Sequence, residues 1–327
     1  MSLATLKRRI WLKVLGVPAD TDTEPFHEFP ELVGKITYHA QWARKKGYVD
    51  FPYFVHLETL ASCNAACEFC PYVKLERKGT RMPDALIEKV VRELADNPRQ
   101  LPFLFAPYKV SDPFLEPRLF DIMNLVGAQL PRARIALITN GSPLTAKTLD
   151  RLAQYRSIAY LNVSLNSDQA DEYERVMNIP FGRTLSRLDE LHQGVRERRF
   201  AFPVRLTRVA VDRESDARFV AFCRGRFPLF EALIAPRNDW IGEVVTPGAN
   251  ARIPDAPCHR WFDLSIVATG DVAFCCMDGE ARYTKGNAAR QNVLEIYNQP
   301  HLRRLREMLP SRIAAPDPCR RCTYLAG

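Results

Sequence analysis

The chain has 327 residues, of which 46% are hydrophobic and 26% charged, a composition that allows a full buried core. It contains no apolar run near the roughly 20 residues that cross a bilayer. Residues 1–16 lack the long apolar stretch and the small-residue cleavage site of a signal peptide. The net charge of +8 is spread along the chain and does not form a stripe with aromatic side chains, which disfavours a nucleic-acid interface. We therefore predict a cytoplasmic protein that binds neither membrane nor nucleic acid.

The predicted elements begin after a polar, partly helical leader. From residue 53 onward, strand-like runs alternate with helical ones, at residues 53–59, 84–95, 101–108, 118–125, 134–138, 146–155, 158–165, 171–177, 186–198, 204–211, 216–224 and 230–235. Six strands separated by helices are typical of a parallel α/β fold. Six repeats are fewer than the eight of a closed barrel, so we predict an open, partial (β/α)6 TIM-like barrel.

A different pattern follows the barrel. Residues 243–257 are rich in Pro, Gly and Ala and resemble a linker, residues 264–276 predict a β-hairpin around Gly270, and a helix is expected at 293–309. We therefore expect a small C-terminal module made of a β-hairpin and a helix. The predicted division of the chain is a 1–50 N-terminal extension, a 51–242 barrel, and a 243–327 linker and module.

The nine cysteines favour metal binding over disulfides. Thiols stay reduced in the cytosol, so a chain without an export signal is a poor candidate for a disulfide framework. Eight of the nine form an early and a late group, at positions 63, 67 and 70 and at positions 258, 275, 276, 319 and 322. Cys223 stands alone in a helical pattern and is expected in the core. Grouped cysteines of this kind indicate a metal site or catalysis.

Three thiols, those of Cys63, Cys67 and Cys70, come directly after the first predicted strand. Three cysteines can hold one cubane cluster and leave a fourth iron without a protein ligand, whereas a structural metal site normally has four ligands. An open iron can bind a substrate or a cofactor. The alternative is a zinc site completed by a distant residue such as His56 or His259.

This CxxxCxxC motif, with Phe69 just before its third cysteine, resembles the radical S-adenosylmethionine superfamily from about residue 53 to the end of the chain. The resemblance implies that Cys63, Cys67 and Cys70 hold a [4Fe–4S] cluster to which S-adenosylmethionine binds. It also implies that the reduced cluster cleaves this cofactor to a 5′-deoxyadenosyl radical, which takes a hydrogen atom from the substrate. The electron would come from an external donor such as flavodoxin or ferredoxin.

The same resemblance implies cofactor contacts at the ends of successive strands. Val110-Ser111-Asp112-Pro113 stands where the family has Gly-Gly-Glu-Pro, with Asp112 in place of the glutamate, and Thr139-Asn140-Gly141 matches the family's Thr-Asn-Gly. In the fifth strand, Thr207 or Arg208 could turn toward the cofactor, because alternate strand residues face opposite ways. The candidate cofactor-binding residues are Phe69, Ser111, Asp112, Asn140, Ser164, Asn166 and Arg208.

The late cysteines can close a second site with four ligands, Cys258, Cys276, Cys319 and Cys322, which by ligand chemistry suits zinc or a [4Fe–4S] cluster. Trp261, Gly270-Asp271-Val272 and the terminal Cys-x-x-Cys resemble the SPASM/twitch branch of the superfamily, in particular its aminocyclitol and sugar dehydrogenases and epimerases. That resemblance implies one auxiliary [4Fe–4S] cluster, hence two clusters in the chain.

Two further residues are candidate catalytic groups. Cys275 adjoins Cys276, and neighbouring strand residues point to opposite faces. Cys275 is therefore a buried thiol, the true ligand in place of Cys276, or a catalytic thiol that returns a hydrogen atom to a substrate radical. Asp239 follows the sixth strand near the mouth of the barrel, where it could accept a proton or hold a substrate hydroxyl.

Our first hypothesis for function is oxidation or epimerisation of a small, polar, carbohydrate- or nucleoside-like metabolite, of the kind found in natural-product biosynthesis. The second is maturation of a ribosomal peptide by thioether or carbon–carbon crosslinks. The third is a non-catalytic protein that binds a metal cluster, which predicts four-ligand sites at both ends and is disfavoured by the three early cysteines.

Overall fold

The computed structural model describes residues 45–244 and 253–324. The chain divides into two compact units, Met1–Gly47 and Tyr48–Gly327, and the second contains every site discussed below. The predicted leader lies almost entirely outside the described residues, as does the centre of the predicted linker. None of the helices in the two described ranges combines the length and the apolar character that a bilayer-spanning helix requires.

Six strands of the described chain form a parallel array, and each coincides with a predicted strand. They are β1 (Phe54–Leu57), β2 (Phe103–Ala106), β3 (Ala133–Thr139), β4 (Ile158–Ser164), β5 (Val204–Val209) and β6 (Glu231–Ala235). Each strand pairs with the next one in chain order. The predicted partial (β/α)6 barrel is thereby confirmed.

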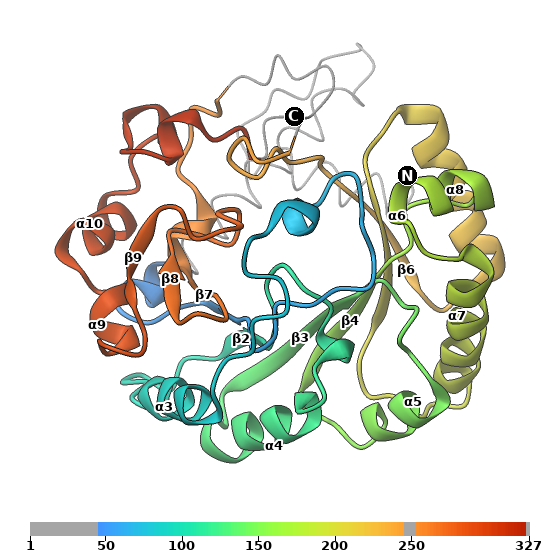
Figure 1. The fold of residues 1–327 in the computed structure, drawn as a ribbon, viewed down its shortest axis with the longest axis horizontal. Coiled ribbons are helices and arrows are strands. Elements are labelled where there is room, and N and C mark those ends of the chain that lie inside the picture. The colour runs from blue at the N-terminus through green and yellow to red at the C-terminus, as the bar shows by residue number, and fades with distance from the viewer. Residues whose placement is uncertain (1–44, 245–252, 325–327) are drawn as a thin grey trace, which may run out of the picture. The chain divides into compact units, whose positions relative to one another are not determined.

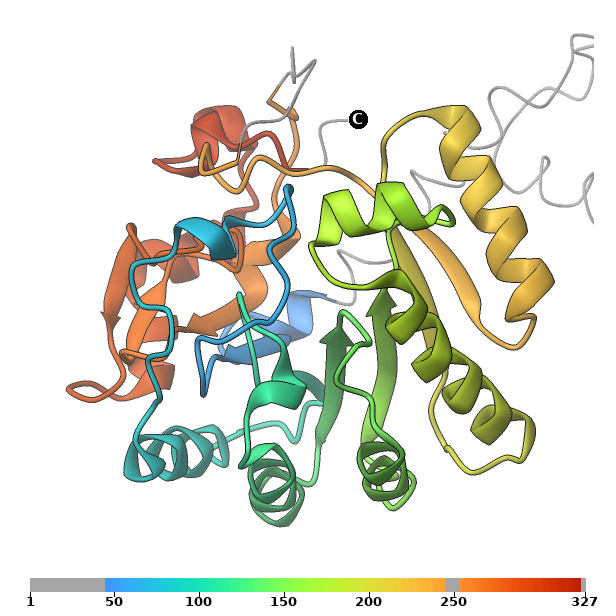
Figure 2. The same ribbon diagram turned by 45° about the vertical axis from the view of Figure 1, so that its right-hand side comes forward.

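Helices follow each of the first five strands. They are α3 (Asp84–Leu94), α4 (Leu119–Gln129), α5 (Ala146–Leu152), α6 (Ala170–Met177), α7 (Phe181–Arg196) and α8 (Arg213–Arg226). In α3 the buried residues Ile87, Val90, Val91 and Leu94 recur at helical spacing and form one apolar side. The helices lie on the outer side of the curved sheet (Figure 1, Figure 2), which leaves its inner side for a ligand.

The C-terminal module extends the barrel sheet. β7 (Asp263–Ile266) pairs with β1 in parallel, and β8 (Asp271–Ala273) and β9 (Thr284–Asn287) follow as antiparallel strands. The β7–β8 hairpin was predicted, with Gly270 at a φ of 88° in its turn. The third strand, β9, and the parallel pairing of β7 with β1 were not predicted. This pairing brings the late cysteines beside the first strand.

The predicted helix at 293–309 is in fact two helices, α9 (Val293–Tyr297) and α10 (Pro300–Met308). Pro300 cannot continue the first helix because it has no backbone N–H, and it is well suited to begin the second. Short 3-10 helices complete the fold at Lys46–Tyr48, Pro71–Lys74, Pro113–Leu115, His259–Phe262, Arg312–Ala314 and Cys319–Arg321.

The inner side of the sheet is polar. Val55 and Leu57 of β1 pack in the hydrophobic core, so the residue between them, His56, faces the inside of the barrel. By the same alternation, Asp263 and Ser265 of β7 face inward. Strands β4 and β5 direct further polar side chains inward, namely Asn162, Ser164 and Thr207.

Candidate active site

The early cysteines occupy the loop that leaves the carboxyl end of β1. The loop is pinned to the end of α6, because the backbone N–H groups of Ala66 and Glu68 donate to Met177 and Val176 carbonyls at 3.1 Å. Burial raises the pKa of the Cys63 thiol to about 11 and that of Cys70 to about 12. This buried environment disfavours ionised thiolates that have no counter-charge, and it suits a cationic metal centre that would neutralise them.

The fit to a three-cysteine site is supported by where the two candidate fourth ligands lie. His56 belongs to a different group of side chains, described below. The Nε2 atom of His259 lies 3.3 Å from the hydroxyl of Tyr324. Each histidine thus has neighbours other than Cys63, Cys67 and Cys70 in the described structure.

Asn140 ties the end of β3 to the cysteine loop. Its Nδ2 donates to Asn64 Oδ1 at 2.8 Å and lies 3.9 Å from Cys63 Sγ. The Asn64 amide in turn donates to Ser142 Oγ at 2.8 Å. Asn140, predicted to contact the cofactor, thus lies beside a cysteine of the proposed cluster site.

Asp112 is held inside this network. One carboxylate oxygen accepts the Phe114 N–H at 3.0 Å, and the other accepts the Thr139 hydroxyl at 2.8 Å and the Asn140 N–H at 2.9 Å. Burial raises the pKa of Asp112, and these hydrogen bonds oppose that rise. Asp112 thus connects the ends of β2 and β3 through these hydrogen bonds, and Ser111 beside it is half-buried. The predicted cofactor contacts of both residues stay predictions.

Arg208 faces away from the barrel interior, contrary to the predicted cofactor contact. Its side chain is fully buried and forms ion pairs with Asp216 at 3.0 Å and Glu172 at 3.1 Å. A third bond runs to the carbonyl of Asn166. Since β5 alternates, Thr207 is the residue that faces inward.

Phe69 and Asn166 line one cavity near the ends of β4 and β5. Asn166 adopts a positive φ of 59°, and its Oδ1 accepts the Val209 N–H at 2.9 Å. The carbonyl of Phe69 accepts the indole N–H of Trp240 at 3.0 Å. Ser164, at the end of β4, is half-buried on the inner side.

Four late cysteines line a second cavity, and they are Cys258, Cys275, Cys319 and Cys322. All four are buried. The indole N–H of Trp261 donates to Cys319 Sγ at 3.2 Å. Burial raises the pKa of Cys319 to about 11 and that of Cys258 to about 12, while the charge of Arg312 lowers both. Four converging thiols suit a closed four-ligand site.

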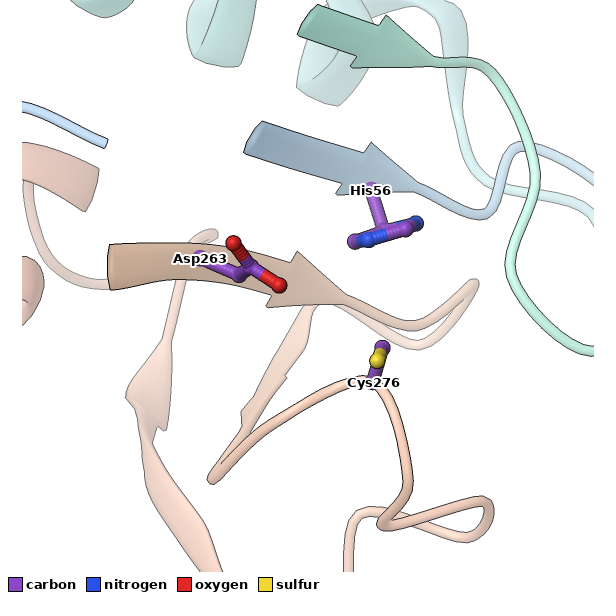
Figure 3. A group of neighbouring side chains, drawn as sticks. All are labelled: His56, Asp263 and Cys276. Carbon is purple, nitrogen blue, oxygen red and sulfur yellow. The ribbon is translucent and has the colours of Figure 1, made fainter. Parts of the chain in front are cut away.

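Cys276, the one of the two adjacent cysteines first proposed as a ligand, does not line this cavity, whereas Cys275, the alternative, does. Cys276 faces the barrel interior with His56 and Asp263, and one side-chain atom from each of the three lies within 4.8 Å of the others (Figure 3). Both cysteines sit in the turn after β8, where Cys275 lines the four-cysteine cavity and Cys276 lies with His56 and Asp263. Burial lowers the pKa of His56 well below its usual value, and the charges of Arg260 and Lys109 add to the effect.

Asp278 shapes that turn, and its role was not foreseen. Its carboxylate accepts the backbone N–H groups of Arg282 at 2.8 Å, Tyr283 at 3.0 Å and Phe274 at 3.3 Å. An aspartate two residues after a cysteine pair was the available sequence signal. By fixing the turn, Asp278 fixes the directions of the two thiols.

A buried ion pair, also missed from the sequence, lies at the centre of a network that joins the barrel to the module. Glu58, directly after β1, is fully buried and accepts Arg77 Nε at 2.7 Å. The same carboxylate accepts the N–H groups of Val110 at 3.1 Å and Ala268 at 3.2 Å. Arg77 also bonds Glu280 at 2.9 Å. A glutamate at the carboxyl end of the first barrel strand was the signal for this contact.

Asp239 helps to form the turn that follows β6. Its Oδ1 accepts the Ile241 N–H at 3.1 Å, and its carbonyl accepts the Val244 N–H at 2.9 Å. Ile241 lines the four-cysteine cavity. Asp239 therefore belongs to a turn that borders that cavity, and its predicted catalytic role at the mouth of the barrel stays a prediction.

Comparison with known proteins agrees with this geometry. The family model of the Radical SAM superfamily matches residues 57–224, and that of the SPASM iron–sulfur cluster-binding domain matches residues 258–323. No curated protein sequence matches the chain.

Three solved structures share the fold. BtrN in complex with AdoMet and 2-DOIA is 16% identical, with a TM-score of 0.53 over 84% of this chain and 94% of BtrN. SuiB of Streptococcus suis bound to precursor peptide SuiA is 16% identical, with a TM-score of 0.59 over 92% and 78% of the two chains. The enzyme anSMEcpe with bound AdoMet and the Cp18Cys peptide is 12% identical, with a TM-score of 0.58 over 82% and 85%. The chain belongs to the radical S-adenosylmethionine superfamily, as an enzyme with a SPASM domain whose cofactors are [4Fe–4S] clusters and S-adenosylmethionine.

Proposed function

We propose that this enzyme abstracts a hydrogen atom from a small, polar, carbohydrate- or nucleoside-like metabolite and yields an oxidised or epimerised product. When bound, the first cluster and S-adenosylmethionine supply the 5′-deoxyadenosyl radical that such chemistry requires. The chain's own residues bind the substrate, exclude water and control protons around the reacting carbon.

The observation that carries this proposal is a set of buried polar atoms without a hydrogen-bond partner among the described residues: His56 Nε2, Tyr108 Oη, Arg260 Nε and Ser265 Oγ. Leaving each such atom unpaired costs roughly 1–3 kcal/mol. His56 and Ser265 are register partners on β1 and β7, and Tyr108 lies near Arg260 and Cys276. A ligand with several hydroxyl or amino groups would satisfy these atoms together.

The cysteine geometry supports an assignment of the two clusters. Cys63, Cys67 and Cys70 would hold the cluster with the open iron, and Cys258, Cys275, Cys319 and Cys322 would enclose the auxiliary cluster. Cys275 takes the place of Cys276 in this assignment because it shares a cavity with the other three thiols. An external flavodoxin- or ferredoxin-type donor remains part of the proposal.

The two outcomes differ in what the chain must do after abstraction. After the hydrogen atom is removed, oxidation of an alcohol releases a proton and one electron. Neutral His56 is an available proton acceptor inside the barrel, and the auxiliary cluster, when bound, would accept the electron. Epimerisation needs a donor that returns a hydrogen atom to the opposite face, and Cys276 is the inward-facing thiol beside that histidine. The thiyl radical left on Cys276 would regain one electron from the external donor and one proton. The state of Cys276 therefore decides between the outcomes.

Peptide maturation is the second candidate function. The observation in its favour is the fold shared with SuiB and anSMEcpe, whose structures contain peptides. The identities of 16% and 12% support a common fold and do not extend to the substrate. The buried, polar character of the barrel interior favours the small-molecule proposal.

A direct test uses anaerobically reconstituted enzyme with S-adenosylmethionine and dithionite in D2O. Panels of aminocyclitols, sugars, nucleosides and cysteine-containing peptides are compared by the rise in 5′-deoxyadenosine that each causes. We expect a rise with a polyhydroxylated small molecule and none with the Cys63→Ala variant. A product that has lost two hydrogens indicates oxidation, and one deuterium in an unchanged formula indicates epimerisation. A rise with peptides alone would overturn the proposal.

A further inference from the structure

We propose that His56, Asp263 and Cys276 form a mononuclear site for a divalent transition-metal ion such as zinc, separate from both iron–sulfur clusters. The three side chains come from β1, β7 and the turn after β8, and all are buried. Imidazole nitrogen, carboxylate oxygen and thiolate sulfur are the three donor types that zinc uses in proteins.

The spacing suits a single ion. One donor atom from each residue lies within 4.8 Å of the other two. Zinc bonds of about 2.0–2.3 Å place tetrahedral ligands roughly 3.3–3.8 Å apart, so movements of about 1 Å would close the site. Figure 3 shows the three side chains converging on one region from separate elements.

A second observation points to a ligand. His56 is only 8% exposed, and its Nε2 has no hydrogen-bond partner among the described residues. Buried imidazole nitrogens are normally paired, because an unpaired one loses its hydrogen bond to water without replacement. A metal ion beside this imidazole would compensate for the loss.

The surroundings orient the proposed ligands. Arg260 donates to Asp263 Oδ2 at 3.1 Å and is itself held by the Tyr324 hydroxyl at 2.9 Å. Carboxylate ligands of metals are commonly hydrogen-bonded in this way. Lys109, the other nearby cation, donates to the carbonyls of Asp278 and Gly279, so its ammonium group is engaged there.

Charge also has to balance at a buried site. A carboxylate and a thiolate carry two negative charges, which equal the charge of a divalent ion. The Arg260 guanidinium adds a positive charge next to Asp263, and this makes both anionic ligands necessary. Removing either Asp263 or Cys276 should therefore weaken binding as much as removing His56.

Three protein ligands leave a fourth coordination position open, as in catalytic zinc sites. The hydroxyls of Tyr108, near Cys276, and Ser265, beside His56, have no hydrogen-bond partner within residues 45–244 and 253–324, and they suit a bound water or a substrate hydroxyl there. This part of the inference rests on the proposed function. With the ion bound, Cys276 could not return a hydrogen atom and His56 could not accept a proton. The ion would instead lower the pKa of a substrate hydroxyl at the open position, which favours oxidation.

The test measures zinc in the full-length enzyme with both clusters present and oxidised. The protein is dialysed against a chelator and then against ZnCl2, and zinc and iron are determined by mass spectrometry. We expect one zinc per chain, with affinity lowered by roughly tenfold or more in His56→Ala, Asp263→Asn and Cys276→Ala. The matched control Cys223→Ala, a buried thiol on α8, should bind zinc as the unmodified enzyme does.

CoCl2 provides a spectroscopic readout. Oxidised [4Fe–4S] clusters are diamagnetic, so the electron paramagnetic resonance signal of high-spin Co2+ can be observed alone and should disappear in His56→Ala. Iron contents equal to those of the unmodified enzyme show that the variants are folded. In the Cys319→Ala/Cys322→Ala variant, which removes auxiliary-cluster ligands, cobalt should still bind.

Absence of zinc and cobalt from the holoenzyme, or equal binding by His56→Ala, would overturn the metal site. Loss of binding only in Cys319→Ala/Cys322→Ala would place the ion in the auxiliary cavity and would also overturn it. Formation of 5′-deoxyadenosine with a small polar substrate tests the proposed function separately. The two proposals can therefore fail independently.

Discussion

Cys275 and Cys276 are adjacent in the chain, yet their thiols face two different sites. Cys275 lines the cavity shared with Cys258, Cys319 and Cys322, whereas Cys276 faces the barrel interior beside His56. The peptide between them thus connects the four-cysteine cavity to the region where we expect the substrate. A single turn, fixed by Asp278, separates the two chemical environments.

Substitution of Cys275 should lower the iron content of the enzyme, whereas substitution of Cys276 should leave it unchanged. Cys275→Ala removes a proposed ligand of the auxiliary cluster and should cost about four irons per chain. Cys276→Ala should retain them, because its thiol lies outside that cavity. Anaerobic iron and sulfide analysis measures both, with Cys223→Ala as the control. Full iron in Cys275→Ala, together with loss in Cys276→Ala, would restore the assignment made from sequence.

The sequence could identify both cysteine groups but could not choose between Cys275 and Cys276. Strand alternation predicted that the two point to opposite sides, and it does not say which side holds the metal. In the structure both residues lie in the turn after β8, where that alternation does not apply. The choice depends on how Asp278 and the pairing of β7 with β1 orient the turn. The pairing of β7 with β1 is a contact between segments far apart in the chain, which the local sequence pattern does not predict.

The same limit applies to Arg208 and Asp112. The six strands followed from the regular exchange of strand-like and helical runs, which is a local property. Whether Thr207 or Arg208 faces the barrel interior depends on which face of β5 each residue occupies. Ion pairs with Glu172 and Asp216 hold Arg208 on the side away from the interior. Asp112 matched a family position, but its hydrogen bonds to Thr139 and Asn140 arise only when β2 and β3 lie side by side.

The buried Glu58–Arg77 pair should contribute strongly to stability. Glu58→Gln removes the fully buried counter-charge of Arg77 and leaves only the more exposed Glu280, so we expect a loss approaching the roughly 3 kcal/mol that breaking a buried pair costs. Urea unfolding under anaerobic conditions measures the loss. Glu280→Gln is the matched control, since Glu280 is more exposed and should cost less. Equal, small losses in both variants would show that the pair is not a main link between barrel and module.

His192 should make stability depend on pH in the mildly acidic range. Burial lowers the pKa of His192, the charge of Arg196 lowers it further, and Asp189 opposes the shift. The unfolded chain then binds the proton more readily, so the stabilisation is complete above the unfolded pKa of about 6.5 and is lost as the pH falls below it.

Thermal unfolding at about pH 7.5 and about pH 5.5 should therefore show a smaller acid loss for His192→Gln than for the unmodified protein. The ring of His192 packs edge-on against Phe227 and Phe230, so the variant is compared with itself at the two pH values. His301→Gln, on an exposed position of α10, serves as the control. An unchanged pH dependence in His192→Gln would contradict the prediction.

The hydrogen bond from Trp261 to Cys319 should raise the reduction potential of the auxiliary cluster. An N–H donor 3.2 Å from a ligand sulfur stabilises the added negative charge of the reduced state. Trp261→Phe keeps an aromatic ring in the cavity and removes the donor, so the potential should become more negative. A redox titration followed by electron paramagnetic resonance measures the shift, provided that iron analysis shows the cluster intact.

Trp240→Phe is the control. It removes an indole that bonds the Phe69 carbonyl and not a sulfur, so it should leave the potential of the auxiliary cluster unchanged. A potential that is unaltered in Trp261→Phe would mean that Cys319 does not carry the electron density of the cluster, and would count against its proposed role as a ligand.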